Sequence, residues 1–224
     1  MFVGHFAAAL ATKRAAPAVS IGTLFLAAQL ADLVWPNLVL AGIEIVEIDP
    51  GNTAMTPLDF VSYPYSHSLV ALSVWGVLAA VAYRLARGLR PAAMITVGLL
   101  VVSHWLLDVV SHRPDMPVTV GGLTKVGFGL WNSVPATMLV ETVLLALGVT
   151  LYGQQTAPRD RTGTWAFVGL IVFLLAVMVA SAVGPPPPSV GAVAWSAQAM
   201  WLIVAWGYWV ERHRVPRSTF RWSR

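Results

Sequence analysis

The sequence predicts an all-α membrane protein, a bundle of six spanning helices preceded by a short helix that reaches only half-way into the bilayer. Hydrophobic residues make up 57% of the 224-residue chain and charged residues only 11%, and the mean hydropathy is +0.71. A soluble domain carries about 25% charged residues, so the composition favours a membrane protein. At this length we expect a single membrane domain, residues 1–224, with no second domain.

Apolar segments long enough to cross a bilayer, ~20 residues each, follow one another along the chain. We predict spans at about residues 18–43, 66–86, 91–112, 133–152, 165–183 and 190–210. The apolar segment 2–12 is too short to cross, and we expect it to pack inside the bundle as a half-depth or re-entrant helix. Glycine, proline and polar residues separate the spans, for example in the loop 44–65 and the glycine-rich stretch 121–129.

Basic residues predict the orientation, because loops rich in Lys and Arg stay in the cytoplasm. If six spans alternate, twelve of the fourteen basic residues fall on one side, and the acidic loop 44–65 lies opposite. We therefore expect a bacterial cytoplasmic membrane protein with a cytoplasmic C-terminus. The Arg-rich tail then anchors the chain to anionic lipid, and no nucleic-acid partner is expected. The twelve are Lys13, Arg14, Arg84, Arg87, Arg90, Arg159, Arg161, Arg212, Arg214, Arg217, Arg221 and Arg224.

Three metal-binding side chains recur every four residues in the predicted span 91–112. His104, Asp108 and His112 advance about 6 Å and turn about 40° per step on a helix, so they line one stripe. A charged group facing lipid costs at least ~2.5 kcal/mol, so this stripe must face a polar interior. The chain has no cysteine, so any metal must be held by His and carboxylate groups.

Four further ionisable residues are predicted at a similar depth, in the outer half of the bundle. His67 opens one span at its outer end, Asp32 and Glu141 lie within two others, and the short first helix lifts His5 toward mid-membrane. Most of the ionisable residues have a structural alternative: Asp32 at the helix break near Pro36, Glu141 between two helices, and His67 and His112 as polar residues at helix ends, while His5 by itself is uninformative. Together they indicate a metal site, with a proton relay or a structural network as the alternatives.

The spacing favours two ions. His104 and His112 are about 12 Å apart along a helix axis, too far to share one ion whose ligand bonds are ~2 Å long. Asp108 lies between them and can bridge one ion near each histidine. Paired ions generate hydroxide and clamp the attacking and leaving oxygens of a phosphate ester. We expect zinc first, with manganese or iron as alternatives.

Each predicted ligand stands in a short sequence motif within residues 1–152. The motifs are Gly4-His5-Phe6, Ala31-Asp32, Tyr65-Ser66-His67-Ser68, Ser103-His104-Trp105-Leu106-Leu107-Asp108, Ser111-His112-Arg113-Pro114-Asp115 and Leu130-Trp131-Asn132-Ser133 through Glu141. With these motifs, residues 1–152 resemble the YdjM-like family of inner-membrane metal-dependent hydrolases. The last two spans and the basic tail, residues 153–224, carry no motif of that family and are expected to be a more variable appendage.

The order of these residues is also similar to the ligand order of the all-helical zinc-dependent phospholipase C and single-strand nuclease group. Two features of that group are missing: Thr137 stands where it has a His, and its N-terminal Trp is absent. The similarity therefore implies two ions and not three, with Asp108 bridging. The ligands that it implies are His5, Asp32, His67, His104, Asp108, His112 and Glu141.

The resulting hypothesis is a membrane-embedded, metal-dependent hydrolase, more specifically a di-zinc enzyme. We expect it to act on the phosphoester of a lipid or lipid-linked substrate at the outer leaflet. Asp32 is expected to be a ligand or the general base. Arg113 is expected to bind a phosphate oxygen or, equally well, to pair with Asp115 in its own loop. The rival hypotheses are an ion- or proton-coupled transporter and a non-catalytic membrane protein whose polar cluster fixes helix packing.

Overall fold

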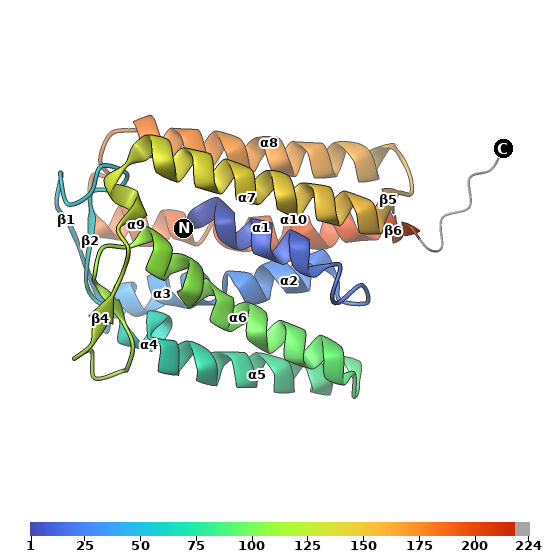
Figure 1. Cartoon of the computed structure of the whole chain (residues 1–224), viewed down its shortest axis with the longest axis horizontal. Coiled ribbons are helices and arrows are strands. Elements are labelled where there is room, and N and C mark those ends of the chain that lie inside the picture. The colour runs from blue at the N-terminus through green and yellow to red at the C-terminus, as the bar shows by residue number, and fades with distance from the viewer. Residues whose placement is uncertain (218–224) are drawn as a thin grey trace.

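A computed structural model describes residues 1–217 as a helical bundle with short strands at its two ends (Figure 1). Within these residues, five helical segments are long and apolar enough to cross a membrane. They are α5 (Leu69–Arg87), α6 (Pro91–Ser111), α7 (Val134–Gln155), α8 (Arg161–Val183) and the segment Val190–Arg212, made of α9 (Val190–Ala197) and α10 (Met200–Arg212).

The first predicted span, residues 18–43, is a bent pair of helices. α2 (Ile21–Ala28) and α3 (Leu30–Leu40) meet at an angle of 50°, and the break falls at Gln29. Pro36 lies within α3 and does not end it. Residues 1–217 therefore contain five candidate spans, or six if the bent pair is one span.

α1 (Phe2–Thr12) is the short helix expected at the start of the chain, and it lies inside the bundle beside α7, α2 and α6 (Figure 1). Val3, Phe6 and Leu10 are fully buried. α1 and α7 approach closely because Gly148 has no side chain: a Cβ atom there would lie 2.5 Å from the carbonyl oxygen of Ala7. Small residues allow such contacts between helices in membranes.

The helices begin and end at residues whose side chains suit those positions. Ser68, Ser133 and Asp160 accept hydrogen bonds from backbone N–H groups in the first turns of α5, α7 and α8, which satisfies donors that a helix leaves unpaired. Gly88 ends α5 with a φ of +77°, a backbone conformation that favours glycine. These local signals set the lengths of the spans.

Short strands and turns form the end of the bundle that lies next to the candidate site. β1 (Ile45–Ile48) and β2 (Leu58–Ser62) form an antiparallel hairpin within the predicted loop 44–65. The chain continues through α4 (Pro64–His67) into α5, and a second small hairpin and one turn of 3-10 helix precede α7. Those last elements are β3 (Met116–Pro117), β4 (Lys125–Val126) and η1 (Leu130–Asn132).

The last helices belong to the same bundle as the rest. α10 packs against α2, where a Cβ atom on Gly207 would lie 3.0 Å from the Cα atom of Gly22. At the opposite end from the hairpins, β5 (Thr156–Pro158) pairs with β6 (Arg214–Pro216) (Figure 1). The described basic residues of the predicted cytoplasmic side gather at this end, whereas Arg221 and Arg224 lie outside the described residues.

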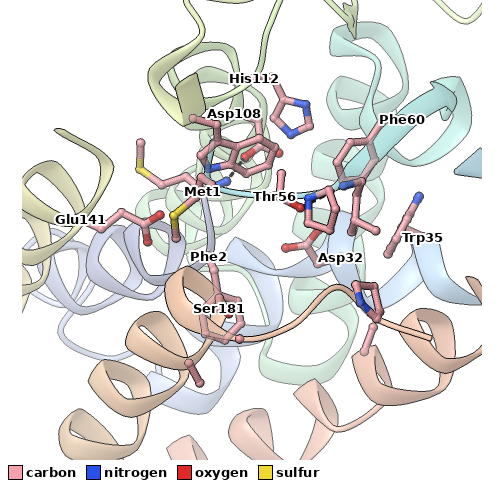
Figure 2. A pocket seen from close by; sticks show the side chains of 18 of the residues that line it. Met1, Phe2, Asp32, Trp35, Thr56, Phe60, Asp108, His112, Glu141 and Ser181 are labelled. Carbon is pink, nitrogen blue, oxygen red and sulfur yellow. Dashed lines mark hydrogen bonds and ion pairs between the residues drawn. The ribbon is translucent and has the colours of Figure 1, made fainter. Parts of the chain in front are cut away.

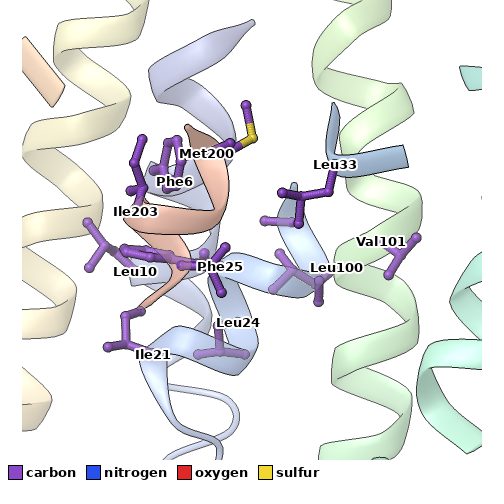
Figure 3. Close-up of a cluster of buried hydrophobic side chains, with 14 of the residues drawn as sticks. Phe6, Leu10, Ile21, Leu24, Phe25, Leu33, Leu100, Val101, Met200 and Ile203 are labelled. Atoms are coloured by element: carbon purple, nitrogen blue, oxygen red, sulfur yellow. The ribbon is translucent and has the colours of Figure 1, made fainter. Parts of the chain in front are cut away.

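The hydrophobic core lies where α1, α2, α6 and α10 meet. Figure 3 shows Phe6 and Leu10 of α1 next to Phe25 of α2 and Ile203 of α10, and Phe6 and Phe25 meet edge to face at 5.0 Å. This packing holds α1 in the middle of the bundle. Its first turn therefore reaches the level at which the polar side chains of α3, α4 and α6 meet.

Candidate metal centre

Five of the seven predicted ligands converge near the first turn of α1, although they come from four helices. His5 lies on α1, Asp32 on α3, His67 at the end of α4, and His104 and Asp108 one turn apart on α6. All but Asp32 are buried, and the side chain of Asp32 is 26% exposed. Figure 2 shows Asp108 and Asp32 on the same cavity, with the amino group of Met1 beside Asp108.

Asp108 lies next to imidazoles from three helices, α1, α4 and α6. Its Oδ1 atom lies 3.0 Å from Nε2 of His5, and its Oδ2 atom lies 3.1 Å from Nε2 of His104. Nε2 of His67 is 3.9 Å from the same Oδ2 atom, and the amino nitrogen of Met1 is 2.6 Å from Oδ1. Both oxygens of this buried carboxylate therefore face nitrogen atoms.

Asp32 makes a second set of contacts with the same cluster. Its Oδ1 atom lies 3.3 Å from Nε2 of His67 and 3.7 Å from Nε2 of His104. The potential ligand atoms form two overlapping groups, in each of which all atoms lie within 4.8 Å of one another. His5, His104 and Asp108 form the first group, Asp32, His67 and His104 form the second, and His104 belongs to both. Adjacent groups of this kind can hold one or two ions.

The surroundings of His104 show how well its side chain suits a cation. Nδ1 of His104 lies 2.7 Å from the carbonyl oxygen of Ala28, at the break between α2 and α3. A carbonyl only accepts hydrogen bonds, so Nδ1 carries the proton and Nε2 of a neutral imidazole is left with its lone pair. That Nε2 atom is buried, makes no hydrogen bond among the described residues and faces two carboxylates. A lone pair opposite carboxylate oxygens requires a positive charge between them, either a metal ion or a proton.

His112 is placed differently from the other predicted histidine ligands and belongs to neither group. Its Nδ1 atom lies 2.9 Å from Oδ1 of Asp115 and 3.3 Å from the hydroxyl of Tyr63. Burial lowers the pKa of His112, against the opposing effect of Asp115, and burial raises the pKa of Tyr63. His112 lines the cavity beside Asp108. The carboxylate of Asp108 therefore lies between His5 and His104, and not between His104 and His112 as the spacing predicted.

Glu141 and Arg113 also have partners outside the two groups. Oε2 of Glu141 accepts hydrogen bonds from the backbone N–H groups of Val3 (2.6 Å) and Gly4 (3.2 Å), so it caps the first turn of α1. Arg113 pairs with Asp59 and with Asp115. It does not line the cavity, and the ion pair with Asp115 is the structural alternative that the sequence left open.

A cavity of about 370 Å³ connects the cluster to the hairpin loop and to the end of α8 (Figure 2). Asp32, His67, Asp108, His112 and Glu141 form its polar side. The rest of its lining could not be predicted, because single apolar residues carry no distinctive signal in so hydrophobic a chain. Phe60 and Trp131 pack against the ring of His112, and Trp35 packs against Phe60. The segment from α8 to α10 contributes Ala180, Ser181, Gly184, Pro185, Ala197 and Met200.

No protein-family model, no curated protein and no solved structure matches this chain.

Proposed function

We propose that this protein is a membrane-embedded, metal-dependent hydrolase that cleaves a phosphoester of a lipid or lipid-linked substrate, with zinc as the first choice of metal. The observation that carries the proposal is the pair of overlapping His and Asp groups on the wall of a cavity. The basic end of the bundle faces the cytoplasm of a bacterial cell, which puts the cavity near the outer leaflet.

The charges around the cavity support a role for metal ions. Its lining contains the carboxyl groups of Asp32, Asp108 and Glu141 against one amino group, that of Met1, and, among the described residues, no Lys or Arg side chain. A lining with this excess of carboxyl groups repels a phosphate group unless further cations balance it. Metal ions would supply this balance and would activate water as a nucleophile.

The residues of the cluster divide into holding and proton-transfer roles. His5, His104 and Asp108 hold one ion, and His67 with Asp32 completes the second group. Asp32 is the most accessible of the five and lines the cavity. Its free carboxylate oxygen is therefore placed to accept a proton from attacking water, as a general base does.

The shape of the cavity supports a lipid substrate. Its side opposite the cluster is formed by small residues near the end of the spanning helix α8, and Ala180, Ser181 and Gly184 there are exposed at the surface of the protein as well as on the cavity. The cavity is therefore open on the side where a bilayer surrounds α8. A lipid phosphoester can reach the cluster from that side while its hydrocarbon chain stays among apolar residues.

Filling this side of the cavity tests the lipid part of the proposal. We expect Ala197→Trp to lower kcat/KM for a phospholipid about tenfold or more, since overfilling a packed site costs about 1–3 kcal/mol. Hydrolysis of the small soluble reporter bis(p-nitrophenyl) phosphate should change little. Ala199→Trp is the matched control, because Ala199 is exposed and does not line the cavity. Equal losses for both substrates, or no loss for either, would contradict a lipid-binding wall.

The hydrolase assignment is tested by activity after metal removal and replacement. We expect purified protein to hydrolyse phosphodiester or phosphomonoester reporters, to lose this activity with a chelator, and to regain it with Zn²⁺, Mn²⁺ or Fe²⁺. Protein that binds metal but cleaves no phosphoester would contradict the assignment.

A proton-binding network is the second candidate, because a proton on Nε2 of His104 would also neutralise the lone pair that faces Asp108. This candidate corresponds to a proton-coupled transporter. It predicts proton-dependent transport in vesicles and no bound transition metal.

A further inference from the structure

Behind His67, on the side away from the cavity, a chain of hydrogen bonds leads to a buried carboxylate. Nδ1 of His67 lies 2.6 Å from Oγ of Ser66, and Oγ of Ser66 lies 2.5 Å from Oε2 of Glu44. Glu44 is 2% exposed and Ser66 is fully buried. The sequence placed Glu44 only among the acidic residues of the outer loop, so its burial is new information.

Glu44 is held in one position by several donors. Its Oε1 atom accepts hydrogen bonds from the backbone N–H groups of Tyr65 (2.8 Å) and Ser66 (2.9 Å). Its Oε2 atom accepts the hydroxyl of Ser66. A carboxylate has no proton to give, so the Ser66 hydroxyl points toward Glu44. The lone pairs of the Ser66 oxygen are then available to His67.

This direction of hydrogen bonding determines which nitrogen of His67 carries the proton. Because the Ser66 hydroxyl donates to Glu44, Ser66 can only accept from Nδ1 of His67. A neutral His67 then has its lone pair on Nε2, the atom that lies 3.3 Å from Asp32 and 3.9 Å from Asp108. A histidine that binds metal commonly has its other nitrogen fixed in this way by a carboxylate or carbonyl.

We infer that Glu44 is a positioning residue for the metal centre: through Ser66 it holds His67 in the tautomer whose Nε2 atom can bind a metal ion. The inference rests on the proposed metal site and extends it to Glu44, which reaches that site only through Ser66 and His67. His104 has the equivalent support from the carbonyl of Ala28. The two histidines of the second group thus present lone pairs to the same point for independent structural reasons.

The substitution Glu44→Gln reverses the direction of the hydrogen bonds from residue 44 through Ser66 to His67, while the side chain keeps its shape. The amide oxygen of Gln can still accept from Tyr65 and Ser66, but its NH₂ group then faces Oγ of Ser66 and donates to it. Without the carboxylate to accept it, the Ser66 hydroxyl turns to the remaining acceptor beside it, Nδ1 of His67, which favours the tautomer with its proton on Nε2 and removes the metal-binding lone pair. We therefore expect Glu44→Gln to weaken metal binding at the group of Asp32, His67 and His104 by at least about tenfold.

The test is a titration of metal-free protein with Co²⁺, followed by visible absorption, together with elemental analysis after Zn²⁺ loading. Wild type, Glu44→Gln, Ser66→Ala and Glu47→Gln are compared. Glu47→Gln is the matched control, the same chemical change at an exposed position of the same outer segment. Ser66→Ala removes the hydrogen bonds between Glu44 and His67 without reversing their direction. It should therefore lose less metal affinity than Glu44→Gln.

The readout separates positioning from a structural role. If Glu44 only stabilises the loop, Glu44→Gln will lower the unfolding temperature of the metal-free protein and leave its metal affinity unchanged. The inference predicts the opposite, a loss of the metal-dependent rise in unfolding temperature. Wild-type affinity in Glu44→Gln overturns it, as does wild-type affinity in Ser66→Ala if Glu44→Gln does not fold. A wild type that binds no metal overturns the proposed function as well, so the two failures are distinguishable.

Discussion

Asp108→Asn is expected to abolish metal binding and to reduce hydrolysis to background. The carboxylate of Asp108 lies within 3.1 Å of Nε2 of both His5 and His104, so it would be the anionic ligand of an ion held by the first group. An amide of the same shape has no charge to offset the ion and presents an NH₂ group in place of one carboxylate oxygen. Elemental analysis and reporter hydrolysis of the purified variant measure both effects.

Asp49→Asn provides the control, because Asp49 is exposed in the hairpin loop at the same end of the bundle. Asp49→Asn should keep wild-type metal content and activity. An Asp108→Asn variant that retains the wild-type quantity of metal would show that Asp108 is not a ligand.

Glu211→Ala is expected to lower the free energy of unfolding by about 3 kcal/mol, because the buried Lys13 ammonium loses its anionic partner, a carboxylate whose side chain is 28% exposed. Nζ of Lys13 lies 2.6 Å from Oε1 of Glu211 and 2.7 Å from the carbonyl oxygen of Val19, and Lys13 is 2% exposed. Oε2 of Glu211 also accepts the backbone N–H of Ile21. Removal of Glu211 leaves a buried ammonium group with one neutral partner, and thermal unfolding in detergent measures the loss.

The double variant Lys13→Met/Glu211→Ala tests the cause of this loss. It removes the buried charge, so it should recover part of the stability that Glu211→Ala loses. Arg14→Ala is the control for the neighbouring basic position, which is exposed, and should have little effect. A double variant less stable than Glu211→Ala would contradict the explanation by an unpaired charge.

The long helices could be predicted from the sequence because hydropathy is a local property of a segment. The predicted spans near 66–86, 91–112, 133–152 and 165–183 coincide closely with α5 to α8. The break at Gln29 could not be predicted, because it depends on contacts with other helices: the side chain of Gln29 is buried, and the Ala28 carbonyl beside it accepts from His104. Lys13 carried an orientation signal in the sequence, but its burial against Glu211 required the fold.

The candidate site was partly predictable for a similar reason. Polar residues inside apolar helices are conspicuous, and comparing their depths brought His5, Asp32, His67, His104 and Asp108 together as the structure does. Depth alone could not separate His112 and Glu141 from these residues, since their partners are Asp115 and the first turn of α1. Glu44 was missed because an acidic residue in a loop ordinarily faces water.

The most direct test of a metal centre is elemental analysis of the purified wild-type protein by mass spectrometry, after exposure to Zn²⁺, Mn²⁺ and Fe²⁺ and removal of free metal. Two overlapping groups that share His104 predict one or two tightly held transition-metal ions per chain. Protein free of transition metal after this treatment would contradict the proposed metal centre. A proton-binding network of these histidines and aspartates would then be the remaining explanation.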